Sequence, residues 1–139
     1  MNKNLENNRP TSPHLDIYKW NICSLTSILH RFTGVTLYLS IVIISWYIVA
    51  FTYNYDLAAT SPKCDCTLWK AFECLTFAAV IGMIIAISYH FSNGIRHLFW
   101  DIGKGFELNR AKFTGYLVLA MTFLISTTVL GFLYYYRYM

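Results

Sequence analysis

The stretch FTGVTLYLSIVIISWYIVAFTYNY, residues 32–55, contains no Asp, Glu, Lys or Arg. Two further charge-free runs follow, of 22 residues at 74–95 and of 24 residues at 113–136. At a rise of ~1.5 Å per residue, helices of these lengths span roughly 33–36 Å, slightly more than the ~30 Å hydrocarbon core of a bilayer. The sequence therefore predicts an all-α membrane protein with three transmembrane helices.

The composition of the 139 residues supports this prediction. The chain is 56% hydrophobic and only 13% charged, whereas an ordinary soluble domain carries about 25% charged residues. Its mean hydropathy is +0.42. A soluble fold would have to cover three long helices that are apolar on all sides, and too little chain remains to do so. The net charge of +4 is explained by basic residues that flank the spans, without a nucleic acid partner.

The basic residues also predict the orientation in the membrane, because cytoplasmic segments carry an excess of Lys and Arg. The N-terminal segment and the second connection are rich in them, and the first connection and the tail are poor. The four groups, in chain order, are Lys3, Arg9, Lys19 and Arg31; Lys63 and Lys70; Arg96, Lys104, Arg110 and Lys112; and Arg137. We expect the N-terminus inside and the C-terminus outside.

Two segments are expected along the chain: a cytoplasmic arm at 1–21 and a three-helix anchor domain at 22–139. The arm contains RPTSPHLDIYKW, residues 9–20, whose two prolines predict an extended conformation. A helix is expected to begin at Ile22–Ser27, and the spans are placed at about 32–55, 72–96 and 112–136. The polar start MNKNLENNRP does not resemble a secretory signal or a good mitochondrial presequence. We expect a multi-pass protein of a bacterial inner membrane, or of the mitochondrial inner membrane if organelle-encoded.

His90, in the stretch HFSNGIRHLFWD at 90–101, is the only histidine well inside a predicted span. It precedes Arg96 by six residues, about 9 Å along a helix. Ionisable groups within a bilayer are costly and by default suggest function. A single histidine can also form a structural hydrogen bond to a neighbouring helix, so position alone leaves both interpretations open.

Gly82, Ala86, His90 and Gly94 recur every four residues and form one stripe of mostly small side chains. Such a stripe accommodates either a packed helix or a flat macrocycle ligated by His90. Basic groups near the inner interface would then neutralise haem propionates, and we name Arg31, Arg96 and His97 for this. Met83 and Met121, the methionines inside spans, are more readily explained by packing. A six-coordinate haem is therefore expected to take its second ligand from another chain.

SILHR, residues 27–31, is the second candidate site. Ser27 and Arg31 lie four residues apart, on one helical face at the cytoplasmic mouth of the first span. A hydroxyl beside a cation suits the carbonyl head group of a quinone, because reduction builds negative charge on oxygen. The alternative is that Arg31 is a snorkelling anchor and Ser27 a residue of the helix start.

The remaining polar residues carry weaker expectations. Asp101 is expected to pair with Arg96 or with a basic residue of the arm. Cys64 and Cys66 are not expected to form a metal site, since their connection offers no histidine, and the absence of CxxCH argues against covalent haem attachment. The third span is expected to be scaffold.

Three ordered motifs resemble one family, the cytochrome b556 subunits of succinate dehydrogenase. RPTSPHLDIYKW is similar to the family's arm, SILHRFTG to its S-I-x-HR-x-TG segment, and HFSNGIRHLFWDIGKG to its H-x-x-NGIRHL-x-WD-x-G segment. The resemblance covers nearly the whole chain after Asn8. The tyrosine-rich tail and the Cys64–Cys66 connection fall outside it.

The resemblance implies an anchor subunit of a four-subunit succinate:quinone oxidoreductase, together with a second membrane anchor, an iron–sulfur subunit and a flavoprotein. This chain would not itself oxidise succinate. The implied cofactors are haem b, shared with the second anchor, and ubiquinone as electron acceptor. His90 matches the axial haem ligand, Ser27 and Arg31 match quinone-site residues, Trp20 an aromatic near that pocket, and His30 a residue near the propionates. The alternative is a non-redox helix bundle, such as a transporter or channel subunit.

Overall fold

The computed structural model describes residues 17–54 and 67–139. Within these residues, every regular element of secondary structure is a helix. Helix α1 runs from Ile22 to Tyr53, α3 from Thr67 to Asp101 and α4 from Leu108 to Tyr138. Each of the three helices is long and apolar enough to cross a membrane, with a mean hydropathy of 2.0 or 2.1 over its most apolar window. The predicted all-α class with three long apolar helices is confirmed for the described residues.

The helices extend beyond most of the predicted spans. Helix α1 begins at Ile22, within the predicted range, after Asn21 caps it by accepting a hydrogen bond from the Cys23 amide. Helix α3 begins before the predicted 72 and ends after 96, and α4 begins four residues before 112. The predictions followed only the charge-free runs, whereas hydrogen-bonded helix continues into the polar ends that reach water. The predicted end at 55 lies outside the described residues, since α1 ends at Tyr53.

A short connection turns the chain between α3 and α4. Gly103 has a φ of 77° and Gly105 a φ of 87°, in the left-handed region that glycine adopts readily. The Gly103 amide donates to the Trp100 carbonyl at 2.8 Å, and the Lys104 amide donates to the Phe99 carbonyl at 3.0 Å. This pattern is a Schellman cap, which satisfies the last carbonyls of α3 and lets α4 return antiparallel to it.

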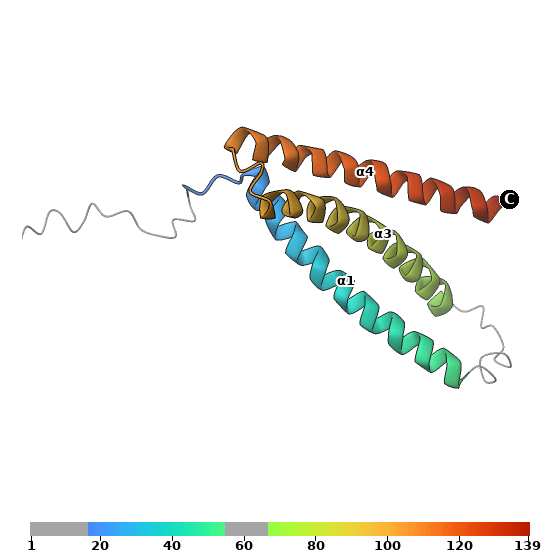
Figure 1. Ribbon diagram of the computed structural model, residues 1–139. Coiled ribbons are helices and arrows are strands. Elements are labelled where there is room, and N and C mark those ends of the chain that lie inside the picture. The colour runs from blue at the N-terminus through green and yellow to red at the C-terminus, as the bar shows by residue number, and fades with distance from the viewer. Residues whose placement is uncertain (1–16, 55–66) are drawn as a thin grey trace, which may run out of the picture.

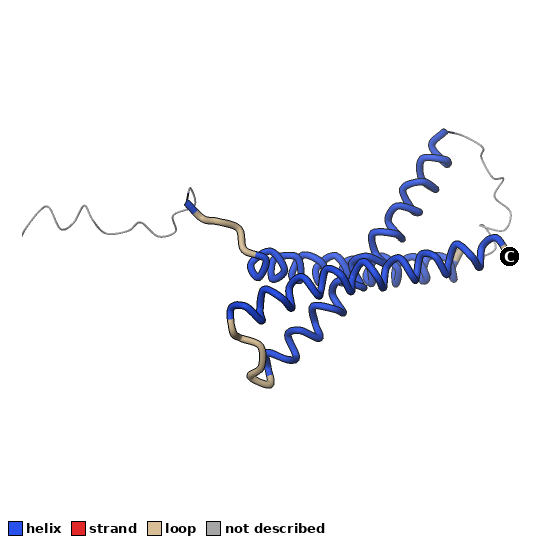
Figure 2. The backbone as a smooth tube through the Cα atoms, turned by 90° about the horizontal axis from the view of Figure 1, so that it is seen from above, coloured by secondary structure: helices blue, strands red, loops and turns tan. Residues whose placement is uncertain are grey.

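The three helices lie close together at the end where α1 begins and α3 turns into α4, and they separate toward the C-terminus (Figure 1). The view from above also shows the start of α3 diverging from α4 (Figure 2). At the close end, a Cβ on Gly115 of α4 would lie only 3.1 Å from Cγ1 of Ile22. Gly115 therefore allows close contact between α4 and the Ile22 side chain of α1.

The described residues bury polar and small side chains and expose large apolar ones. This is the arrangement expected in lipid, where helices associate through small residues and interhelical hydrogen bonds rather than through apolar burial. Phe32, Trp46 and Phe123 are each about two-thirds or more exposed. The buried residues are Thr26, Ala86, Ser88, Tyr89, Ser92, Asn93, Arg96, Ala111, Val118, Thr122 and Ser126, with Gly115.

Candidate functional site

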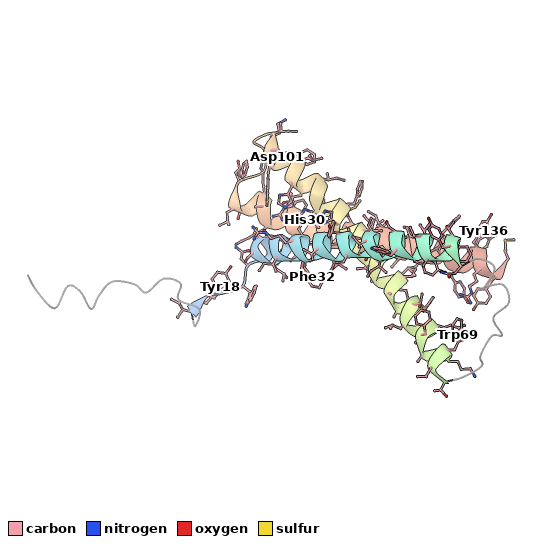
Figure 3. All side chains as sticks on the ribbon, turned by 90° about the horizontal axis from the view of Figure 1, so that it is seen from below. Tyr18, His30, Phe32, Trp69, Asp101 and Tyr136 are labelled. Carbon is pink, nitrogen blue, oxygen red and sulfur yellow. The ribbon has the colours of Figure 1, made fainter. Side chains whose placement is uncertain are left out.

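Three histidines gather where α1 packs against α3. The rings of His30 and His90 are stacked, with centroids 4.0 Å apart and planes 8° apart, and the centroid of His97 lies 4.9 Å from that of His30. Figure 3 shows His30 on the side of α1 toward α3 and Phe32 on the opposite side. Two sequence motifs that are 60 residues apart, SILHR and HFSNGIRH, therefore form one site.

The three rings do not form a common metal site. Within residues 17–54 and 67–139, no group of three His, Cys, Asp or Glu side chains is arranged to hold an ion. The lone pairs of an imidazole lie in its ring plane, so the stacked rings of His30 and His90 cannot direct nitrogens at one ion between them. His30 is thus excluded as a second axial ligand opposite His90 in this arrangement.

Helix α1 holds the His90 ring at two further points. Thr33 Oγ1 lies 3.3 Å from His90 Nδ1, and a Cβ on Gly34 would come within 3.2 Å of His90 Cε1. No described residue forms a hydrogen bond with His90 Nε2, and His90 is only half-buried. The structural hydrogen bond considered from the sequence therefore exists, but it engages Nδ1 and leaves the other ring nitrogen for a ligand.

The small-residue stripe of α3 has open space at two of its positions. A Cβ on Gly82 or Gly94 would meet no atom of the described residues within 4 Å, whereas Ala86 is 7% exposed and packs inside the bundle. The uncovered positions Gly82 and Gly94 are compatible with a flat group on this face and equally with an additional helix. Both interpretations of the stripe remain compatible with the structure.

Arg96 differs from its expected position at the propionate level. It is 5% exposed, and its guanidinium lies 4.2 Å from the ring centroid of Trp100. Its N–H groups donate to both neighbouring helices, at Thr26 Oγ1 (2.8 Å), Thr114 Oγ1 (3.1 Å) and the Ala111 carbonyl (2.9 Å). Arg96 therefore joins α1, α3 and α4, and its donors are used inside the chain rather than on a ligand.

The expected pairing of Arg96 with Asp101 is also wrong for this chain. Asp101 is exposed at the end of α3 and forms no ion pair with Arg96, whose N–H groups donate to Thr26, Thr114 and Ala111. The physical reason is that Arg96 lies on the buried face of α3, where hydroxyl and carbonyl oxygens of the neighbouring helices satisfy its donors. The other suggested partner of Asp101, the arm, lies mostly outside the described residues.

Tyr89 adds a further hydrogen bond between α1 and α3, and Asn93 is buried nearby on α3. The Tyr89 hydroxyl donates to the Thr26 carbonyl at 2.7 Å, and Tyr89 is 5% exposed. Asn93 is 0% exposed, and neither amide atom has a hydrogen-bond partner in the described part of the chain. His30 Nδ1 is likewise buried without a partner. Polar contacts from α3 to Thr26 of α1 therefore come from Tyr89 and from Arg96.

Ser27 and Arg31 lie one turn apart on α1, as the spacing predicts. Ser27 is half-buried and Arg31 exposed, and neither side chain has a hydrogen bond or ion pair within the described residues. Trp20 precedes the helix, is 72% exposed and contacts Tyr18 edge-on, with 5.9 Å between ring centroids. The structure therefore leaves the hydroxyl and the guanidinium accessible, but within the described residues the Trp20 ring contacts Tyr18 rather than the histidine cluster.

Sequence reasoning named His30 but missed Thr26 and Thr33, which lie on the same face of α1 and also contact α3. Thr26, His30 and Thr33 are spaced four and three residues apart, so they lie on one face of α1. All three contact α3: Thr26 bonds to Tyr89 and Arg96, and the other two contact His90. A search for polar residues at helical spacing inside an apolar span would have found this set.

Comparisons with known proteins agree with the geometry. Residues 6–129 match the family described as Succinate dehydrogenase/Fumarate reductase transmembrane subunit. The chain is 40% identical over 120 residues to the succinate dehydrogenase cytochrome b556 subunit of Rickettsia felis, covering 86% of this chain and 89% of that protein. It is 36% identical over 124 residues to the b556 subunit of Paracoccus denitrificans, covering 88% and 90%.

A mitochondrial relative is also similar. The chain is 36% identical over 125 residues to the human succinate dehydrogenase cytochrome b560 subunit, covering 90% of this chain and 72% of that protein. The agreement over most of the chain decides against a non-redox transporter or channel subunit. The chain belongs to the succinate dehydrogenase/fumarate reductase transmembrane subunit family and is a multi-pass membrane cytochrome b subunit of a succinate dehydrogenase complex.

Proposed function

We propose that this chain binds haem b at an interface with a second membrane anchor and that His90 supplies one axial ligand through Nε2. The observation that carries the proposal is the His90 ring, held between Thr33 and His30 with Nε2 unengaged by any described residue. The open space at Gly82 and Gly94 leaves room for a flat group beside it. A bound haem supplies a one-electron redox centre.

A second chain is needed to complete the ligation. His30 is stacked on His90 and faces the wrong way for the opposite axial position, and His97 lies beside His30. We assign His30 and His97 to the propionate side, together with the exposed Arg31, whereas Arg96 is engaged within the bundle. The test is the reduced-minus-oxidised spectrum of the purified complex, in which a b-type band is expected. A complex without that band overturns the haem proposal.

The quinone-reduction site is proposed at Ser27 and Arg31, with Trp20 near its entrance. The support is that both polar groups are free of partners within the described residues and lie on one face of α1, one turn apart. A hydroxyl donor and a cation stabilise the negative charge that develops on a quinone oxygen during reduction. Ser27 donates one hydrogen bond, and Arg31 contributes charge and orientation.

Replacing Ser27 by alanine, or Arg31 by glutamine, is expected to slow succinate–ubiquinone reductase activity by about 10–100-fold, because a hydrogen bond to a charged group contributes ~1.5–3 kcal/mol. Succinate oxidation by an artificial dye should stay at the wild-type rate, since it does not use this site. Ser24→Ala, a half-buried hydroxyl on the previous turn, is the matched control. Equal loss in the quinone and dye assays would indicate failed assembly and contradict the proposal.

The remaining subunits are proposed to be a second three-span anchor, an iron–sulfur subunit and a flavoprotein, with electrons passing from succinate to ubiquinone in respiration. The proposed orientation places the N-terminus and the 102–107 connection in the cytoplasm, or in the mitochondrial matrix. The membrane is a bacterial inner membrane, or the mitochondrial inner membrane for an organelle-encoded chain. The distribution of Lys and Arg supports this orientation.

Trypsin added to the cytoplasmic face of membrane vesicles is expected to cut after Lys104, which is exposed in the connection between α3 and α4. Vesicles of the opposite orientation should be protected at this position. Lys104→Gln is the control that identifies the cleaved bond on an immunoblot. Cleavage after Lys104 from the outer face alone would reverse the proposed topology.

A further inference from the structure

We propose that Thr33 is a positioning residue for the haem: its hydroxyl fixes the tautomer and orientation of His90 so that Nε2 is the nitrogen presented to the iron. The inference rests on the proposed haem ligation by His90. Thr33 belongs to the SILHRFTG motif, but the motif by itself assigns it no role. The contact that carries it joins Thr33 Oγ1 on α1 to His90 Nδ1 on α3, at 3.3 Å.

The direction of this hydrogen bond follows from the single hydrogen of the hydroxyl. Thr33 Oγ1 lies 2.9 Å from the Leu29 carbonyl oxygen and 3.0 Å from the His30 carbonyl oxygen, and carbonyl oxygens only accept. The Thr33 hydrogen is therefore directed at its own helix backbone. Toward His90, the hydroxyl oxygen then offers lone pairs, so we assign the hydrogen to His90 Nδ1, which donates it.

The tautomer of His90 then follows. A neutral imidazole carries one ring hydrogen, and if Nδ1 holds it, Nε2 has a free lone pair. Histidines that ligate metals almost always donate their other N–H to an oxygen, which fixes the ring orientation and makes the ligating nitrogen more basic. Thr33 supplies that oxygen within this chain.

The arrangement is rigid because three residues of α1 confine one ring. The Thr33 hydroxyl is held by its backbone bonds in a helix, where a β-branched side chain has few rotamers. The His30 ring lies parallel to His90 with 4.0 Å between centroids. Gly34 lies so close to the ring that a Cβ at this position would be only 3.2 Å from His90 Cε1. Within HRFTG, residues 30–34, His30 therefore packs on the face of the His90 ring, Gly34 lies against its Cε1 atom, and Thr33 contacts Nδ1.

The experiment compares three substitutions in the assembled complex. Thr33→Val keeps the branched shape but removes the acceptor, and it is expected to lower haem retention during purification by about tenfold, within the range for lost partners of metal-ligating histidines. It should also raise the haem midpoint potential, because a less basic imidazole stabilises the oxidised iron less. Thr33→Ser restores an acceptor and should return both values toward wild type.

Thr36→Val is the matched control, because the Thr36 hydroxyl bonds to the Phe32 carbonyl at 2.9 Å on the same helix without contacting His90. It should leave haem retention and potential unchanged. If Thr33→Val also leaves both unchanged, or if Thr36→Val changes them equally, the role of Thr33 is overturned while His90 ligation stands. A b-type band that survives replacement of His90 would instead overturn the proposed function, and with it this inference.

Discussion

Replacing His90 by glycine is expected to abolish the b-type absorption band of the purified complex, because no other histidine of the described residues can take its position. His30 is stacked parallel to His90, so its nitrogens cannot take over the vacated direction without a change of ring orientation. The small side chain leaves a cavity in which free imidazole can bind. Added imidazole should therefore restore part of the band, as measured by the reduced-minus-oxidised spectrum and the haem-to-flavin ratio.

Two controls separate ligation from folding. His97→Ala removes a neighbouring imidazole whose centroid lies 4.9 Å from that of His30, and it should weaken haem retention while keeping the band position. Imidazole rescue requires a folded site, so a misfolded His90→Gly chain would show no recovery. A full b-type band in His90→Gly without added imidazole would contradict the assignment of His90 as axial ligand.

Replacing Arg96 by alanine is expected to destabilise the helix bundle by roughly 2–4 kcal/mol, since each hydrogen bond to a charged group contributes ~1.5–3 kcal/mol and interhelical bonds in membranes fall at the low end or below. The change removes the only side chain in the described residues that bonds to both other helices. It also removes the cation over the Trp100 ring. We expect a large loss of assembled complex in the membrane and a lower midpoint temperature in detergent.

Arg96→Lys tests whether charge alone is sufficient. A lysine ammonium is a compact point charge, whereas the planar guanidinium reaches several acceptors in fixed directions. We therefore expect Arg96→Lys to be nearly as unstable as Arg96→Ala. Arg110→Ala is the matched control, because Arg110 forms an exposed 2.9 Å ion pair with Glu107, and such pairs contribute only about 0–1 kcal/mol. Wild-type stability of Arg96→Lys would contradict the proposed joining role.

Much of the histidine site could be predicted from sequence. The sequence identifies His90 because an ionisable group inside an apolar run is costly. It identifies Ser27 and Arg31 because a hydroxyl and a cation lie one helical turn apart on one face. The resemblance to the cytochrome b556 subunits then implied the roles of His30 and Trp20. Those roles remain proposals, although the structure brings His30 into contact with His90.

The error at Arg96 has a specific cause. A cation at the end of an apolar run is normally assigned to the membrane surface, and the sequence does not tell which face of α3 meets α1 and α4. The acceptors that bond to Arg96 come from residues 26, 111 and 114, which lie on the two other helices. Thr33 was missed for the same reason: its partner, His90, lies 57 residues later.

The sequence by itself determined the three long helices and their membrane environment, because these depend on local hydrophobicity and on backbone hydrogen bonds within each helix. It also determined that an ionisable ring would lie inside the second span. Only the tertiary structure decided that His30 stacks on that ring, that Thr33 Oγ1 lies 3.3 Å from its Nδ1, and that Arg96 points into the bundle. These facts depend on the rotation and register of α1 against α3, which are set by side-chain packing between helices rather than by the pattern along any one of them.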